Sequence, residues 1–326
     1  MEKKDLRIVF MGTPEFAVGS LKQLMENGYN VVAVVTQPDK PVGRHGSVLR
    51  ASAVKEYALE HGLPVLQPVK MKDPEFIEQL REYNADLQVV VAFRMLPEVV
   101  WDMPRFGTFN VHAALLPQYR GAAPINWAVI NGETKTGVTT FFLDHDIDTG
   151  RIIMQREFPI PDDVDVEYVY DGLMELGAGI CQDTVDLVIS TDGNVPSQPQ
   201  REDIELKAAP KIFKETCQID WNNNAKHIYD FVRGLSPYPG TWTTLASNSE
   251  TEKTDASVMK IFKTAKTGTS CAGVEPGTLK TESNHLLVAT NDEWLDIVEL
   301  QAAGKKRMAA RDFLNGFKHI ADMHMK

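Results

Sequence analysis

The polar residues near the middle of the chain have the side-chain types that acyl transfer requires. Asn110 and His112 stand two positions apart in an apolar run, and Asp144, Asp146 and Asp148 follow downstream. In a β-strand, residues i and i+2 point to the same face, so the amide and the imidazole would be neighbours. Both can donate hydrogen bonds to an oxyanion, while a carboxylate can orient the imidazole and accept a proton. The pattern predicts a transfer that needs neither a metal nor a covalent intermediate.

Structural roles remain open for all of these residues. Most polar residues at strand ends cap backbone groups, and aspartates in loops commonly stabilise turns. A calcium loop that starts at Asp144 is a third interpretation, because such loops begin with alternating aspartates. Its sixth position should be glycine and is Thr149, and its twelfth should be glutamate and is Gln155. The calcium interpretation fails, and the residues alone do not choose among the three acids.

Small and apolar residues follow His112. The run Ala114-Leu115-Leu116-Pro117 leads into Arg120-Gly121-Ala122-Ala123-Pro124. Small residues let a flat ligand approach the backbone, although a simple turn into the next helix explains them equally well. A dinucleotide-binding site would have three spaced glycines after the first strand, but this chain has Gly12-Thr13-Pro14 there, with one glycine. Because the chain also lacks nucleophile-elbow, zinc-helix and phosphate-loop motifs, most hydrolases, metalloenzymes and kinases are excluded.

A long loop is expected over residues 36–52, and it carries Lys40, Arg44 and Arg50 within an acidic region. Basic residues on surface loops are usually just solvated. Structureless loops of this length are nevertheless uncommon in compact domains and often functional. Contact with phosphate groups is therefore the second interpretation of the three cations.

The first half of the chain alternates strand and helix signals. Strands are expected at 6–12, 31–36, 65–67, 87–93 and 108–112, with helices at about 13–27, 53–61, 73–83 and 124–130. Such alternation indicates βαβ units and a mostly parallel, Rossmann-like sheet, and therefore an α/β N-terminal domain. Further strands are predicted at 138–143 and 151–158, and one long helix at 167–188.

The composition changes after residue 190. The polar, proline-bearing stretch 191–210 is predicted to be a linker with little structure of its own. Beyond it, a helix at 225–234 precedes a β-rich region with a hairpin over 286–300. We expect a catalytic domain at 1–190, the linker at 191–210, and a smaller β-barrel (OB-like) domain at 211–326.

Charge and cysteine content narrow the possible surroundings and partners. The net charge of the 326 residues is −11, yet residues 1–209 hold 19 Lys and Arg against 31 Asp and Glu, whereas residues 210–326 hold 15 against 14. A polyanionic partner for the second domain is therefore permitted. Three separated cysteines favour a reducing cytosol over a disulfide framework. No apolar run approaches the roughly 20 residues of a membrane span, so a cytoplasmic protein is expected.

These segments together resemble the folate-dependent formyltransferases, and most closely the methionyl-tRNA formyltransferase family. The resemblance covers nearly the whole chain: residues 6–16, 36–44, 110–124 and 148–150 in the first domain, and 219–221, 237–242, 304–306 and 312–316 in the second. The Asn-x-His and Asp-x-Gly elements are shared with folate-dependent formyltransferases generally. The basic loop and the second domain narrow the resemblance to the tRNA enzymes.

The resemblance implies a role for each matching residue. Asn110, His112 and Asp148 match the catalytic trio of the family. Arg44 matches a basic residue on the loop that enters the tRNA acceptor end, and Lys40 and Arg50 would also bind tRNA. Folate would be bound by two segments, Ala114, Leu115, Leu116 and Pro117, and Phe93, Arg94, Met95 and Leu96. Family members commonly have serine at the position of Ala114, so a hydroxyl is absent there.

The implied reaction passes the formyl group of 10-formyltetrahydrofolate to the amino group of methionine on initiator methionyl-tRNA. The amine would attack directly and form a tetrahedral intermediate, with no metal, in a monomeric enzyme that has no membrane partner. Three alternatives remain: a formyltransferase for a small amine such as a glycinamide nucleotide or an amino sugar, a formyl-folate hydrolase, and a non-catalytic tRNA-binding protein.

Overall fold

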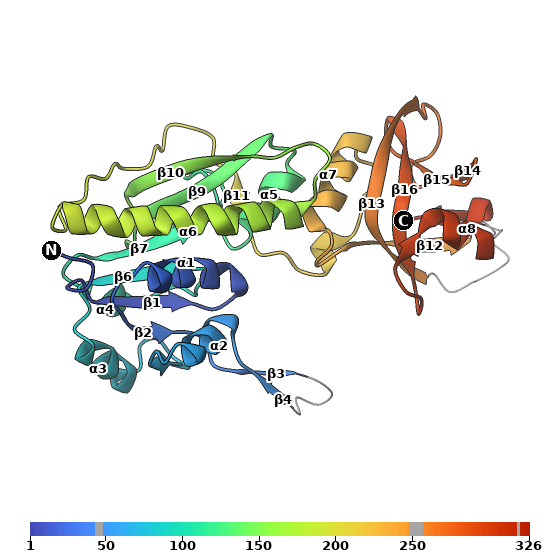
Figure 1. Ribbon diagram of the computed structural model, residues 1–326. Helices are drawn as coiled ribbons and strands as arrows, with labels where there is room; N and C mark the ends of the chain where they lie inside the picture. The colour runs from blue at the N-terminus through green and yellow to red at the C-terminus, as the bar shows by residue number, and fades with distance from the viewer. Residues whose placement is uncertain (43–47, 248–256, 318–319) are drawn as a thin grey trace. The chain divides into compact units, whose positions relative to one another are not determined.

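The computed structural model describes residues 1–42, 48–247, 257–317 and 320–326. The chain forms two compact units (Figure 1). Unit 1 comprises residues 1–124, 135–159 and 170–209, and unit 2 comprises 125–134, 160–169 and 210–326. The second unit therefore includes two short segments that lie between parts of the first unit along the chain.

Unit 1 is built on a seven-stranded sheet with the strand order β10-β9-β7-β6-β1-β2-β5. Five strands are parallel: β1 (Ile8–Gly12), β2 (Val31–Val35), β5 (Val65–Leu66), β6 (Leu87–Val91) and β7 (Thr108–His112). At one end of the sheet, β9 (Lys135–Phe142) pairs antiparallel with β7, and the edge strand β10 (Ile152–Pro159) pairs antiparallel with β9. The expected α/β, mostly parallel fold is confirmed.

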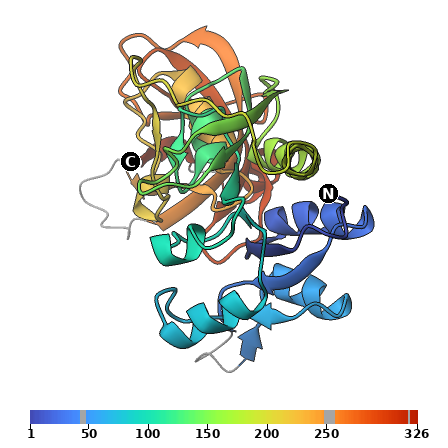
Figure 2. The same cartoon turned by 90° about the vertical axis from the view of Figure 1, so that its left-hand side faces the viewer.

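Helices cover both faces of this sheet, which explains why its central strands are continuous apolar runs. All five residues of β1 and of β6 are buried. One face carries α1 (Glu15–Glu26), α2 (Ala53–Glu60) and α6 (Val166–Ser190), and Figures 1 and 2 show α1 beside α6. The other face carries α3 (Pro74–Glu82) and the short α4 (Glu98–Trp101), which pack in a core with Val9 and Met11.

Local signals set the helix ends. Asp73 accepts a hydrogen bond from the amide of Glu75, and Pro74 occupies the first turn of α3, as the sequence predicts. The expectation for α1 is off by one residue. Pro14 is the N-cap and makes no side-chain capping bond, so Thr13 lies outside the helix. Its other end agrees, because Gly28 has a φ of +76°.

Unit 2 contains a second seven-stranded sheet, which is antiparallel and nearly closed. Its strands follow the order β14-β15-β16-β13-β12-β18, with β17 paired to β16, and a bridge between Thr278 and His324 joins the two ends. The strands are β12 (Thr241–Ser247), β13 (Ser257–Ser270), β14 (Leu279–Glu282), β15 (His285–Ala289), β16 (Glu293–Ala302), β17 (Met308–Ala309) and β18 (Met323–Met325). The expected barrel is confirmed, and β15 with β16 forms the predicted hairpin.

Helices complete unit 2. They are α5 (Pro124–Ile130), α7 (Ala225–Leu235), α8 (Ala310–Gly316) and the single turns Glu215–Cys217 and Ile320–Asp322. Asn224 caps α7 by accepting a hydrogen bond from the amide of His227. Ile228 and Val232 of α7 pack into the core of the barrel.

Two predicted loops have more structure than expected. In the 36–52 loop, β3 (Lys40–Val42) pairs with β4 (Val48–Arg50) as a two-stranded ribbon. In the 191–210 stretch, β11 (Ala208–Ala209) pairs in parallel with β8 (Arg120–Gly121). The polar stretch is therefore bonded to the segment that follows β7.

Two leucines test how much the core of unit 1 contributes to its stability. Leu21 in α1 is fully buried, whereas Leu59 in α2 is 60% exposed. We expect Leu21→Ala to lower the free energy of unfolding of unit 1 by about 2–5 kcal/mol, since it removes buried apolar contacts and leaves a cavity. Leu59→Ala should cost less than about 1 kcal/mol. Urea unfolding followed by circular dichroism checks both, and equal losses would contradict this assignment of the core.

Candidate active site

The last residues of β7 bring the amide and the imidazole to the carboxyl edge of the sheet, where parallel α/β folds bind ligands. Asn110 lies opposite Phe141 and His112 opposite Thr139 in the β7–β9 ladder. Only 6% of His112 is exposed, and its ring lies edge-on to Phe141 with 6.4 Å between the ring centroids. Asn110 and His112 therefore share one face of a buried strand, as their spacing predicts.

The surroundings of His112 fix the roles of its two ring nitrogens. Nε2 lies 2.9 Å from the carbonyl oxygen of Tyr119. A carbonyl oxygen can only accept, so Nε2 carries a hydrogen and donates it there. Nδ1 faces Asp148, with 3.8 Å between Nδ1 and Oδ2. When the ring is neutral, Nδ1 therefore carries no hydrogen, and a second proton on the ring would be placed at Nδ1, facing the carboxylate.

Asn110 has an unsatisfied group at this edge. Its Oδ1 atom is buried and has no hydrogen-bond partner. Buried polar atoms are nearly always paired, so an unpaired one beside an imidazole indicates a place for a polar group of a ligand. The carboxamide can offer such a group both an acceptor and a donor.

The structure places only one of the three candidate aspartates beside His112. Asp144 and Asp146 are exposed, and Asp144 Oδ1 accepts hydrogen bonds from the amide of Asp146 and the hydroxyl of Thr149. These two acids belong to the turn. The Asp148 carboxylate is mostly buried and accepts a hydrogen bond of 2.9 Å from the amide of Gly121. Asp148 also has a left-handed backbone with a φ of +57°, an uncommon conformation for a residue with a side chain.

The 114–117 turn is held by side chains that the sequence interpretation missed. The Thr139 hydroxyl donates to the carbonyl of Ala114 over 2.6 Å and accepts from the amide of Leu116 over 3.1 Å. Gln155 Nε2 donates to the Leu116 carbonyl and to the Thr139 hydroxyl. Both residues lie on predicted strands, but nothing in a strand pattern reveals that two polar positions bind one turn.

The 93–96 segment divides into residues that pack and residues that line a pocket. Phe93 packs against the core beneath α3 and α4. Arg94 donates to the carbonyl oxygens of Pro68 and Val69, and burial lowers the pKa of its guanidinium. Arg94 thereby ties this segment to the loop after β5.

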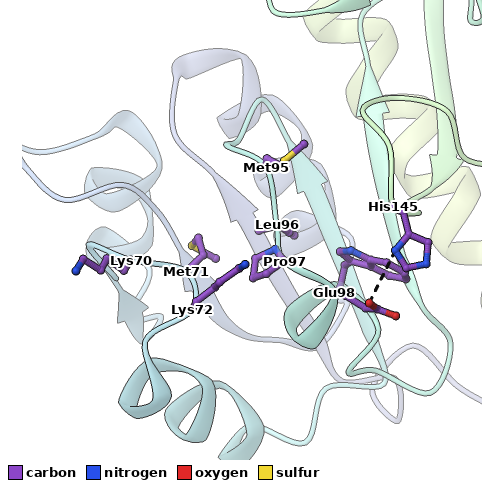
Figure 3. A pocket seen from close by; sticks show the side chains of 9 residues that line it. Lys70, Met71, Lys72, Met95, Leu96, Pro97, Glu98 and His145 are labelled. Atoms are coloured by element: carbon purple, nitrogen blue, oxygen red, sulfur yellow. Dashed lines mark ion pairs between the residues drawn. The ribbon is translucent and has the colours of Figure 1, made fainter.

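Met95 and Leu96 contribute to a pocket of about 490 Å³ in unit 1 (Figure 3). Its other lining residues come from the loop after β5, from α4 and from the acidic stretch: Lys70, Met71, Lys72, Pro97, Glu98, Trp101 and His145. His145 Nδ1 lies 3.8 Å from Glu98 Oε2, and the His145 ring lies edge-on to Trp101. A pocket of this volume, with apolar walls and a few charged groups, suits a small organic ligand.

The basic loop is only partly described. Lys40 and Arg50 are exposed and lie opposite each other on the β3–β4 ribbon. The third cation, Arg44, lies outside the described residues. Beside the ribbon, Lys55 forms an ion pair of 2.7 Å with Asp39, and its hydrogen bond lowers the pKa of that carboxyl group.

The described residues offer neither a metal-binding cluster nor a membrane-spanning helix. They contain no group of three or more His, Cys, Asp or Glu side chains arranged to hold a metal ion. Within the same residues, no helix has both the length and the apolar character needed to cross a membrane.

Gly121 provides a test of how tightly the site is packed. A Cβ atom there would lie 2.4 Å from the carbonyl oxygen of Ala209, and Gly121 has a φ of +128°. We expect Gly121→Ala to lower the free energy of unfolding by more than about 2 kcal/mol and to increase trypsin cleavage after Lys207, which is exposed but whose backbone pairs with Tyr119. The control is Gly28→Ala, where φ is +76° and no atom lies within 4 Å of the added Cβ. Unchanged cleavage at Lys207 in Gly121→Ala would contradict the predicted clash.

Comparisons with known proteins agree along the whole chain. Residues 6–185 match the family model described as formyl transferase, and residues 211–318 match the model of the formyl transferase C-terminal domain. A protein of Parabacteroides distasonis named methionyl-tRNA formyltransferase is 60% identical over 99% of both chains. The protein of the same name from Bacteroides fragilis is 56% identical over all of this chain and 99% of its own.

Solved structures share the fold at low sequence identity. An N-formyltransferase from Helicobacter canadensis, in complex with folinic acid and dTDP-3-aminofucose, has a TM-score of 0.61 and 18% identity over 93% of this chain and all of its own. HypX from Aquifex aeolicus, in complex with tetrahydrofolic acid, has a TM-score of 0.59 and 18% identity over 96% of this chain and 47% of its own. By sequence and by fold, the chain belongs to the formyl transferase family, within the group of the methionyl-tRNA formyltransferases.

Proposed function

We propose that the protein transfers the formyl group of 10-formyltetrahydrofolate to the amino group of methionine on initiator methionyl-tRNA. The observation that carries the proposal is the short separation of His112 from Asp148, beside the unpaired Oδ1 atom of Asn110. The chain that holds these three residues is 60% identical to a relative named for this activity. An amide, an imidazole and a carboxylate are the groups that acyl transfer to an amine requires.

The reaction exchanges one carbon–nitrogen bond for another. The neutral amine attacks the formyl carbon, the new bond forms, the bond to N10 of the folate breaks, and the proton lost by the amine reaches N10. His112 acts through Nδ1, because its Nε2 hydrogen is bonded to the Tyr119 carbonyl. Protonated Nδ1 and the Asn110 amide donate to the developing oxyanion, while Asp148, 3.8 Å from Nδ1, stabilises the charged imidazole and relays the amine proton.

The residues around the pocket suit a folate donor. Met95 and Leu96 would supply apolar contact, while the exposed Lys70 and Lys72, which also line the pocket, would attract the carboxylates of the glutamate tail. The 114–117 turn supplies the wall beside His112, since Thr139 and Gln155 keep its backbone in place. These residues bind and orient the donor, and no metal is required because its formyl amide is already activated.

A tRNA acceptor would explain the second domain and the basic loop. We assign catalysis to residues 1–190, the connection to 191–210 and tRNA binding to 211–326, where Lys305 and Lys306 are exposed. Lys40, Arg44 and Arg50 would meet the acceptor end of the tRNA. We further propose that the enzyme acts as a monomer in the cytoplasm. A small amine is the less favoured acceptor, because the relatives that are 56% and 60% identical over nearly the whole chain are named for the tRNA enzyme.

Removal of the catalytic side chains tests the activity. We expect His112→Ala and Asp148→Asn to lower turnover by about 10²–10⁴-fold, because each loses an oxyanion donor or the group that orients it. The assay measures formyl-methionyl-tRNA made from 10-formyltetrahydrofolate and charged initiator tRNA, with folate affinity measured in parallel.

Exposed residues of the same types serve as controls. His61→Ala and Asp146→Asn should keep normal turnover, since both side chains are exposed. Near-normal activity in His112→Ala would exclude the proposed role. Formate release without an amine acceptor would indicate a hydrolase instead, and tRNA binding without any transfer would indicate a binding protein.

The basic loop is tested by its effect on one substrate only. We expect Lys40→Ala, Arg44→Ala and Arg50→Ala each to raise the KM for charged tRNA by about five- to ten-fold, because each removes a cation that would contact phosphate. The KM for folate should not change, and the salt dependence of the tRNA KM should weaken. The controls are Lys22→Ala and Arg81→Ala, which remove exposed cations from α1 and α3. An increase in the folate KM alone would refute the assignment.

A further inference from the structure

Gln200 is an unusual residue for a connecting segment. It lies in the polar stretch 191–210, yet it is only 9% exposed. In contrast, Gln198 is exposed, although its backbone pairs with Ile152. A buried glutamine with a long, flexible side chain loses conformational freedom, so the bonds it makes must compensate for that cost.

The Gln200 carboxamide is bonded at both ends. Its Nε2 donates to the carbonyl oxygen of Asp148 over 2.7 Å and to that of Gly150 over 2.9 Å. Its Oε1 accepts from Nε and Nη2 of Arg120 over 3.1 Å and 2.7 Å. One side chain thus joins the acidic stretch to the segment that follows β7.

These bonds converge on the carboxylate beside His112. Asp148 has a left-handed backbone, and such a conformation persists only where its surroundings hold it. Gln200 holds the carbonyl of Asp148, while Gly121, the neighbour of Arg120, holds its carboxylate. Moving either partner would change the 3.8 Å separation between Asp148 Oδ2 and His112 Nδ1.

We propose that Gln200 is a positioning residue for formyl transfer, which sets the orientation of Asp148 toward His112 through the backbone. The inference rests on the proposed function. The segment that carries Gln200 is then part of the active site as well as a connection to unit 2. Its last residues support this role, because the carbonyls of Lys207 and Ala209 accept hydrogen bonds from the amides of Tyr119 and Ala122.

Gln200→Glu removes the donor atom of the carboxamide and keeps its acceptor atom. The ionised glutamate still accepts from Arg120 but has no hydrogen for the carbonyls of Asp148 and Gly150. We expect its turnover to fall by about 10–100-fold at about pH 8.5, with the KM for folate and for charged tRNA within about three-fold of wild type. The loss should persist at lower pH, because a glutamate has an ordinary pKa near about 4.3 and the neighbouring Arg120 stabilises its ionised form.

Gln198→Glu is the matched control, because it adds the same charge to the same segment on an exposed side chain. It should keep wild-type turnover at every pH. Gln200→Ala removes both halves of the carboxamide and should lose at least as much turnover; if that variant does not fold, Gln200→Glu, which keeps the bonds to Arg120, decides alone.

Two results would overturn the inference: wild-type turnover in Gln200→Glu, or a deficit that lies in the KM values and leaves turnover unchanged. In both, the wild-type protein still formylates charged tRNA, so the proposed function stands. An inactive wild-type protein would refute the proposed function and this inference with it.

Discussion

The arrangement of the site depends on a short piece of backbone, the peptides of Tyr119 to Gly121. The Tyr119 carbonyl accepts the Nε2 hydrogen of His112, and the Gly121 amide donates to the carboxylate of Asp148. Main-chain groups have fixed directions, so this stretch orients both side chains before any substrate arrives. Only Nδ1 of the imidazole is then available for catalysis, and the Asp148 carboxylate faces that atom.

The surrounding structure keeps that backbone in place. The parallel pairing of β8 with β11 occupies its outer side, and Gly121 leaves no room there for a side chain. On the other side, Thr139 and Gln155 bind the turn between His112 and Tyr119. Thr139 is fully buried and each of these polar groups is hydrogen-bonded, so the network is rigid, in contrast to the buried Oδ1 of Asn110, which has no partner.

The sequence predicted what depends on local pattern. Apolar runs located the strands, and the i, i+2 spacing placed Asn110 and His112 on one face. It could not locate contacts between distant segments: Gln200 lies 52 positions from Asp148, in a stretch without hydrophobic periodicity. The grouping of residues 125–134 and 160–169 with the barrel unit was likewise hidden, because it depends on tertiary contacts. Asp148 was separable from Asp144 and Asp146 only by resemblance, since all three have the same turn chemistry.

The path of the chain after α6 limits where this protein can be divided. The match to the first family model ends at residue 185, before Gln200 and before β11. A fragment that ends at residue 185 would keep Asn110, His112 and Asp148. It would lose β11, which pairs beside Gly121, and the side chain of Gln200, which bonds the carbonyl of Asp148. A fragment meant to keep the proposed site would therefore need the chain as far as Ala209, and shortening this stretch would remove bonds to Asp148 and to the segment after β7.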